Sequence, residues 1–357
     1  MTYKEKIQHL IEKVPTTIVD WSVERVSSKE PTQAFSEFLT NREQGDWAER
    51  LILQAINSLS EDLVAVHYGK SDTRIAGEEG FKQFYKEYQD ELDKIGKRPD
   101  ILVLKKSDYD EAWNYNISSL PNTELDAIVH KAIAGVEIRS SSFLIGKYDN
   151  TIKSNKLKNI DLLISLKNDI IKKHSQNLID KNLAIVKKIS SENLNIKGFR
   201  FTKREKDKEL RGDISELRKL IEKVEKRDFL SITVKQEDIK VVSKWIETYG
   251  IPHYYFQVFF DKVYGISFHD VLEILGNTEL EDKNFYIEKN KKNQEKTTIH
   301  ISSKSGKEIA HKVDFPNHKS QVKELERGRL LFHVTFEGGT AYLNETNLFD
   351  LLNLKSS

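Results

Sequence analysis

The chain has 357 residues, of which 38% are hydrophobic, 10% aromatic and 32% charged, and its formal net charge is +1 at pH 7. This balance excludes an intrinsically disordered chain, and the length leaves room for two lobes because single hydrophobic cores stop growing near about 250–300 residues. The absence of cysteine excludes disulfides, thiolate metal sites and cysteine nucleophiles.

Residues 1–44 predict an N-terminal helical segment, with apolar residues at helix spacing and breaks at Pro15 and Pro31. The first residues carry a charge every few positions and lack the apolar centre of a signal peptide. No stretch of the sequence approaches the length of a membrane span. We therefore expect a cytoplasmic protein without membrane contact.

A predicted core begins at residue 45 and runs to residue 143. Its first element is an amphipathic helix with Asp46 as the N-cap and Glu49 one turn further on. Residues 63–68 (LVAVHY) predict the first strand. Aromatic and apolar residues then recur at helix spacing from Phe81 to Ile95, and Gly96 is placed to end that helix.

The sequence Arg98-Pro99-Asp100 opens the next strand, Ile101 to Leu104. Proline has no N–H to donate to a sheet, so Pro99 suits the first position of a strand and places Asp100 at its mouth. A second β-rich run extends from Ala127 to Ile138 and contains Glu137. If the two strands pair, Asp100 and Glu137 lie side by side.

Two adjacent carboxylates with a cation two residues beyond the second, here Arg139, form a site for a hard divalent ion. Mg²⁺ prefers oxygen ligands and supports phosphodiester hydrolysis. The same spacing also fits a strand-opening turn followed by a surface glutamate. Walker, dinucleotide-binding, HExxH and GxSxG motifs do not occur, which leaves metal-dependent hydrolysis as the chemistry with the best support.

Residues 144–229 predict a basic helical insertion. From residue 151 to 230 there are 21 Lys and Arg against 12 Asp and Glu, an excess that the rest of the chain almost balances. Such a segment can present a basic face to DNA phosphates, or it can consist of solvated charged helices. The candidate DNA contacts are two pairs of neighbouring lysines, Lys172 with Lys173 and Lys187 with Lys188.

Residues 230–270 return to the core. Leu230 to Val234 and His253 to Phe260 predict strands, and Asp238 to Tyr249 predicts a helix that Gly250 closes. We expect the first of these strands, which Lys235 follows, to lie beside the Glu137 strand. Residues 271–357 predict a C-terminal α+β region. The expected fold is α/β, with a mixed central β-sheet flanked by helices.

Pro99-Asp100 followed by Glu137-Ile138-Arg139 and then serines resembles the PD-(D/E)xK nuclease superfamily, and its setting resembles type II restriction endonucleases. The runs IPHYYFQVFFD (residues 251–261), YGISF (264–268) and FHVTF (332–336) are similar to the AccI-like family. The resemblance implies a restriction-endonuclease-like core, Mg²⁺ as cofactor and double-stranded DNA as substrate. It also implies a homodimer and a cognate methyltransferase as functional, not physical, partner.

The resemblance also implies roles for particular residues. Asp100, Glu137 and the backbone carbonyl of Ile138 would hold the metal, and Glu49 would add a third carboxylate. Arg139 stands where the superfamily usually has lysine, so Lys235 is a candidate for positioning the attacking water. Two alternative functions remain open: a repair or recombination nuclease, and a DNA-binding module without catalysis.

Overall fold

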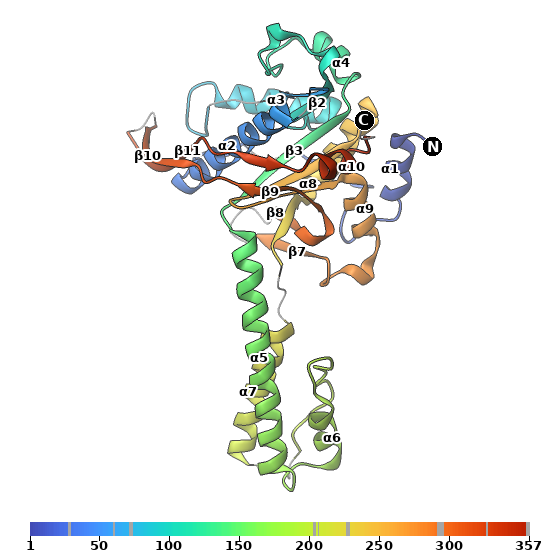
Figure 1. Ribbon diagram of the computed structural model, residues 1–357, viewed down its shortest axis with the longest axis vertical. Coiled ribbons are helices and arrows are strands. Elements are labelled where there is room, and N and C mark those ends of the chain that lie inside the picture. Colours follow the sequence, from blue (N-terminus) through green and yellow to red (C-terminus); the bar gives the residue numbers. More distant parts are fainter. Residues whose placement is uncertain are drawn as a thin grey trace. The chain divides into compact units, whose positions relative to one another are not determined.

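The computed structural model describes residues 1–27, 30–59, 61–70, 74–202, 205, 207–225, 229–290, 296–325 and 328–354. The chain divides into two compact units, one formed by Met1–Ile145 with Phe229–Ser357 and the other by Gly146–Asp228. The first unit is a mixed β-sheet flanked by helices, which confirms the predicted fold class (Figure 1).

The sheet of the first unit has seven strands in the order β1-β2-β3-β5-β6-β9-β12. Strands β3 and β5 pair in parallel, and the other neighbours in this sheet are antiparallel. The bounds are Leu63–His67 for β1, Ile101–Lys105 for β2, Ala134–Ser141 for β3, His253–Phe259 for β5, Val263–Ser267 for β6, Lys307–Val313 for β9 and Ala341–Leu343 for β12. The expected pairing of the Asp100 and Glu137 strands is confirmed, since Ile101 of β2 lies opposite Val136 of β3.

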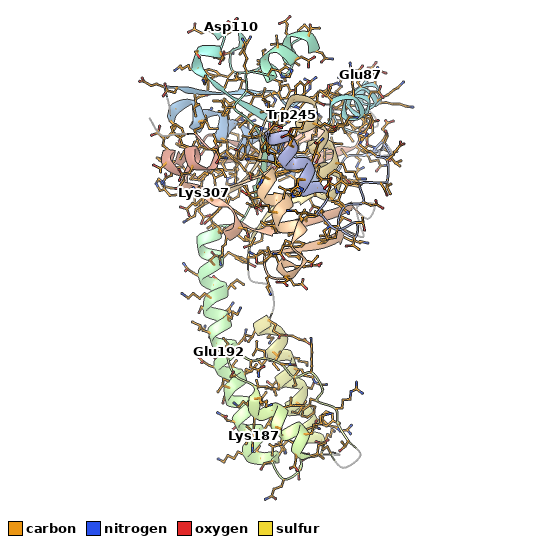
Figure 2. All side chains as sticks on the ribbon, turned by 90° about the vertical axis from the view of Figure 1, so that its right-hand side faces the viewer. Glu87, Asp110, Lys187, Glu192, Trp245 and Lys307 are labelled. Carbon is orange, nitrogen blue, oxygen red and sulfur yellow. The ribbon has the colours of Figure 1, made fainter. Side chains whose placement is uncertain are left out.

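Each face of this sheet has its own apolar core. Helices α2 (Ser36–Leu59) and α10 (Glu345–Leu351) pack on one face, together with Val136 and Ile138. Helices α1 (Tyr3–Ile11), α8 (Gln236–Tyr249) and α9 (Phe268–Gly276) pack on the other, around the fully buried Trp245 that Figure 2 labels. Because side chains alternate along a strand, Glu137 and Arg139 project toward the α8 face.

Two smaller sheets complete the first unit. Strands β4 (Ser231–Lys235), β8 (Lys296–Ser302) and β7 (Phe285–Asn290) form one, and β10 (Asn317–Glu324) with β11 (Leu330–Glu337) form the other. Helices α3 (Phe81–Ile95) and α4 (Asn122–Val129) flank the loops before β2 and β3. Short 3₁₀ turns occur at Lys106–Asp108, Glu111–Trp113, Thr278–Leu280 and Ser303–Ser305.

Three local expectations are wrong. Ala127 to Val129 ends helix α4, where Leu125, Ile128 and Val129 bury one helical face. Asp46 is inside α2 and not its N-cap, because the apolar face of that helix already begins at Leu39. The β4 strand pairs with β8, whereas the neighbours of β3 are β2 and β5, so Lys235 does not end a strand beside Glu137.

The second unit is helical. Its elements are α5 (Ile145–His174), α6 (Asp180–Lys188) and α7 (Lys208–Glu225), which share an apolar core that includes Leu163, Ile170, Val186 and Leu217. In the described part of the chain, no helix combines the length and the apolar character needed to cross a bilayer.

Candidate active site

Asp100 lies in the loop that enters β2, and both its backbone and its carboxylate are held. Its carbonyl oxygen accepts hydrogen bonds from the N–H groups of Tyr68 (2.9 Å) and Gly69 (3.0 Å), just after β1. Its Oδ2 accepts a hydrogen bond of 2.6 Å from the backbone N–H of Ile138 in β3. This contact brings Asp100 next to Glu137, as the sequence predicts.

Glu137 is 1% exposed and belongs to a network of four charged side chains. Lys97 Nζ lies 2.5 Å from Glu137 Oε1 and 2.9 Å from Asp238 Oδ2. Arg139 Nη2 lies 2.9 Å from Glu137 Oε1 and 2.7 Å from Asp238 Oδ2. Two cations therefore share the same two oxygen atoms, and the charges within the network balance.

The charged neighbours and burial shift the pKa values of the carboxylates in different directions. Burial raises the pKa of Glu137, but the positive charges of Lys97 and Arg139 outweigh burial and hold this pKa below its ordinary value. The same two cations depress the pKa of Asp238 more strongly against the effect of burial. Burial and then the negative charge of Glu137 raise the pKa of Asp100 to about 7.

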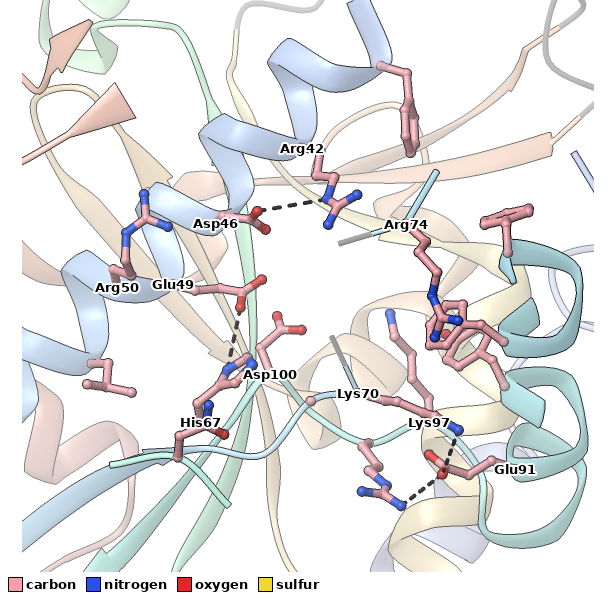
Figure 3. A pocket seen from close by; sticks show the side chains of 18 of the residues that line it. Arg42, Asp46, Glu49, Arg50, His67, Lys70, Arg74, Glu91, Lys97 and Asp100 are labelled. Carbon is pink, nitrogen blue, oxygen red and sulfur yellow. Dashed lines mark hydrogen bonds and ion pairs between the residues drawn. The ribbon is translucent and has the colours of Figure 1, made fainter. Parts of the chain in front are cut away.

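Glu49 of α2 is close to Asp100 at a pocket of about 670 Å³. Figure 3 shows both carboxylates directed into this cavity, with Lys70 and Arg74 across from them. Burial and the negative charge of Asp100 raise the pKa of Glu49 well above its ordinary value. Its Oε2 is 3.7 Å from Nδ1 of His67. Glu49, Asp100 and Glu137 thus form a group of carboxylates that repel one another.

Asp100 and Glu137 offer carboxylate oxygens to a divalent cation, but among the described residues the oxygens of Glu137, Asp100 and Glu49 do not all lie within 4.8 Å of one another. Glu137 Oε2 is buried and has no hydrogen-bond partner among the described residues, although a buried carboxylate oxygen without a partner is costly. The raised pKa values of Asp100 and Glu49 indicate that nearby positive charge does not compensate their burial. A hard cation bound between these oxygens would give Glu137 Oε2 a partner and would compensate the buried negative charge of Asp100 and Glu49.

Of the other predicted site residues, Ile138 lies beside Asp100, whereas Lys235 and the two lysine pairs lie elsewhere. Ile138 contributes its N–H to Asp100 and buries its side chain in the core on the α2 face. Lys235 is exposed at the end of β4 and lines a second pocket together with Lys97 and Asp238. Lys172 with Lys173, and Lys187 with Lys188, are exposed in the last turns of α5 and α6 in the helical unit, where Figure 2 labels Lys187.

Sequence reasoning missed Lys97 and Asp238. Lys97 precedes Asp100 by three residues and comes from the turn that ends α3, and Asp238 lies in the first turn of α8. A lysine close to the Pro-Asp pair was a visible signal for Lys97. Nothing local marks Asp238, since an acidic residue in the first turn of a helix is ordinary.

Gly96 determines where Lys97 lies. It ends α3 with a φ of +83°, and a Cβ atom there would stand 2.2 Å from the carbonyl oxygen of Val241 in α8. The N–H of Lys97 donates to that same oxygen at 2.9 Å. The close approach of this turn to α8 therefore holds Lys97 within reach of Glu137 and Asp238.

We expect Gly96→Ala to destabilise the protein by roughly 2–4 kcal/mol, because it combines a left-handed φ with a backbone clash. Urea unfolding measures the effect. Gly45→Ala is the matched control: Gly45 lies inside α2, and a Cβ atom there would meet no atom within 4 Å, so alanine should stabilise by roughly 0.5–1 kcal/mol. Equal unfolding midpoints for the two variants would contradict this account of the turn.

Comparison with known proteins agrees with the resemblance noted in the sequence. A family model described as AccI restriction endonuclease matches residues 1–357, the whole chain. No curated protein and no solved structure matches the chain.

Proposed function

The chain belongs to the AccI restriction endonuclease family, and on that basis we propose that it is a Mg²⁺-dependent type II restriction endonuclease. In this proposal it hydrolyses phosphodiester bonds of double-stranded DNA at a short specific site. The observation that carries the proposal is the contact between Asp100 and the backbone beside Glu137, which unites two carboxylates and two cations at the mouth of β2.

The metal would be held by Asp100, Glu137 and the carbonyl of Ile138, with Glu49 as a further carboxylate. When bound, Mg²⁺ supplies a Lewis acid that neutralises phosphate charge and makes water a better nucleophile. The buried, unpartnered Oε2 of Glu137 supports this assignment. Its other oxygen, Oε1, is engaged by Lys97 and Arg139, which fix the orientation of the carboxylate.

Arg139 and Lys97 act through their positive charge. Arginine has too high a pKa to transfer a proton at neutral pH, but it can stabilise the negative charge that develops on a reacting phosphate. Burial lowers the pKa of Lys97, yet the charges of Asp238 and Glu137 hold it well above its ordinary value. Lys97 therefore remains an ammonium ion and is a donor of hydrogen bonds, not a base.

Two copies of the chain would cut the two strands of a symmetric site, because a two-fold DNA sequence is most simply matched by a two-fold protein. The homodimer and a methyltransferase that protects the same site both follow from the proposed restriction function. A neighbouring methyltransferase gene would support restriction over repair or recombination.

If the helical unit contacts DNA phosphates, double replacement of Lys172 and Lys173, or of Lys187 and Lys188, by alanine should weaken binding equally for all sequences. The slope of log affinity against log salt should become shallower by about 0.9 for each phosphate that is no longer neutralised. Lys105 and Lys106 are the control pair, exposed at the end of β2 opposite to Asp100. An unchanged slope in both helical pairs would remove this unit from the interface.

Incubation of the purified protein with plasmid DNA and Mg²⁺ tests the proposal. We expect discrete fragments that disappear when EDTA is added. Intact plasmid would contradict nuclease activity, and a smear would favour a nuclease without sequence preference over a restriction enzyme.

A further inference from the structure

The β10 and β11 strands form a two-stranded ribbon at the edge of the first unit. β11 lies against α2: the N–H of Val334 donates to Thr40 Oγ1 at 3.2 Å, and Arg50 Nη2 donates to the carbonyl of Phe336 at 3.0 Å. β10 is the outer strand and is exposed along almost its whole length (Figure 1). Such an edge is open to a partner.

The register divides the ribbon into an apolar and a polar face. On the apolar face Val322 lies opposite Phe332. On the polar face Lys319 lies opposite Thr335, and Gln321 lies opposite His333. Side chains in directly opposed positions share one face, so the polar face presents two neighbouring pairs of hydrogen-bonding groups.

The polar face is turned toward the rim of the pocket that contains Asp100. Lys323, on this face, pairs with Glu78 at 2.8 Å, and the Glu78 carboxylate accepts a hydrogen bond of 2.6 Å from the N–H of Ile75. Leu331, also on this face, is buried in a small core with Ile75 and with Leu39 of α2. The residue before Ile75 is Arg74, which lines the pocket.

The apolar face meets α2 at a different point. Phe336 lies on that face, and its ring contacts those of Trp47 and Phe260, with centroids 6.5 Å and 6.3 Å apart. Both faces of the ribbon therefore meet α2, at Leu39 on the polar side and at Trp47 on the apolar side, and Lys323 links the polar side to the pocket rim.

We propose that the polar face of this ribbon enters the major groove of DNA and that Gln321 selects the sequence there, with Lys319 beside it. A two-stranded ribbon fits the major groove, where glutamine can pair bidentately with adenine and lysine with guanine. β10 carries Lys319 and Lys323. Lys319 lies 3.6 Å from Glu337 and Lys323 lies 2.8 Å from Glu78, so DNA phosphates would replace these carboxylates as partners of the two lysines. The inference rests on the proposed function and names the element that reads the substrate.

The competing partner is a second copy of this chain. On the apolar face Val322, Leu330 and Phe332 are 54%, 50% and 60% exposed. That face could be covered in a dimer without excluding DNA from the other. The observations favour DNA for the polar face because Lys323 links this face to the loop at the rim of the pocket that contains Asp100.

Selection of bound duplexes from a random library, with Ca²⁺ in place of Mg²⁺ to avoid cleavage, tests the inference separately from nuclease activity. The full-length protein should enrich one sequence motif. Gln321→Ala should enrich the same motif with one base pair per half-site made degenerate, corresponding to a loss of about 10- to 100-fold in discrimination. Ser320→Ala, the exposed neighbour on the other face, should leave the motif unchanged.

Three outcomes would overturn the inference: a wild-type protein that enriches no motif, a Gln321→Ala variant that retains the wild-type motif, and equal relaxation of the motif by both variants. Sedimentation of a Phe332→Ser variant tests whether the ribbon instead contacts a second copy of this chain. Loss of the dimer together with an intact motif for Gln321→Ala would assign the ribbon to contact between copies. Failure of plasmid cleavage alone would contradict the proposed function and leave the selection result standing.

Discussion

Asp100→Asn and Glu137→Gln should each reduce DNA cleavage to background while the protein still folds and binds DNA. Each change removes a negative charge with little change in side-chain volume. The proposed metal would lose a charged ligand, and the lysines and arginines outside the site would still contact phosphates. Single-turnover cleavage and Ca²⁺-supported DNA binding, measured on the same preparations, separate the two effects.

Asp100→Ala and Glu137→Ala should differ in their effect on the stability of the protein. The carboxylate of Asp100 accepts a hydrogen bond from a backbone N–H, so Asp100→Ala breaks no ion pair with Lys97 or Arg139. Glu137→Ala leaves those two cations with Asp238 as their shared anion. Removing one partner of a buried pair costs about 3–5 kcal/mol, so thermal unfolding should distinguish the variants.

Asp126→Asn is a suitable control because Asp126 accepts a hydrogen bond from the Tyr249 hydroxyl and does not line the pocket that contains Asp100. It should cleave at the wild-type rate. Cleavage near that rate by Asp100→Asn or Glu137→Gln would end the assignment of that residue to the metal site.

Elements with strong local signals could be predicted from the sequence. Helix α3 with Gly96 at its end, and α8 with Gly250 at its end, are found where periodicity and glycine place them. The strand expected over Ala127 to Val129 was wrong because β-branched residues favour a strand in isolation, whereas here the first two turns after Pro121 bury a helical face. The pairing of β4 with β8 joins residues about 70 positions apart, which no local pattern specifies.

The same distinction applies to the site. The side-by-side placement of Asp100 and Glu137 depends on one antiparallel pairing of nearby strands, so spacing was enough to predict it. Lys97 meets Asp238 across 141 positions, and this contact depends on how the turn after α3 packs against α8. Such packing follows from the whole core and is not encoded in a motif.

Replacement of Arg139 or Lys97 should cause the second large loss of cleavage. Both contact Glu137 Oε1 and Asp238 Oδ2, so they share one pair of counterions. Loss of a charge contact to the transition state typically costs about 10²- to 10³-fold in rate. We expect Arg139→Ala to lose cleavage by at least that factor and Lys97→Met to lose a similar amount, whereas Arg139→Lys should keep measurable activity because a positive charge remains.

The double variant decides whether the two cations act as one unit. Because residues that act together are not additive, Lys97→Met with Arg139→Ala should cleave no more slowly than the slower single variant. If the double variant instead loses cleavage rate by the product of the two single losses, each cation contacts the reacting phosphate independently.

Lys235→Ala completes the series. Lys235 is exposed at the end of β4 and its charge lowers the pKa of Asp238, but Lys97 and Arg139 already bridge Asp238 to Glu137. Since those two bridges remain when Lys235 is replaced, the single-turnover rate of Lys235→Ala should stay within a few-fold of the wild-type rate. An inactive Lys235→Ala enzyme that still binds DNA would instead place Lys235 in the site.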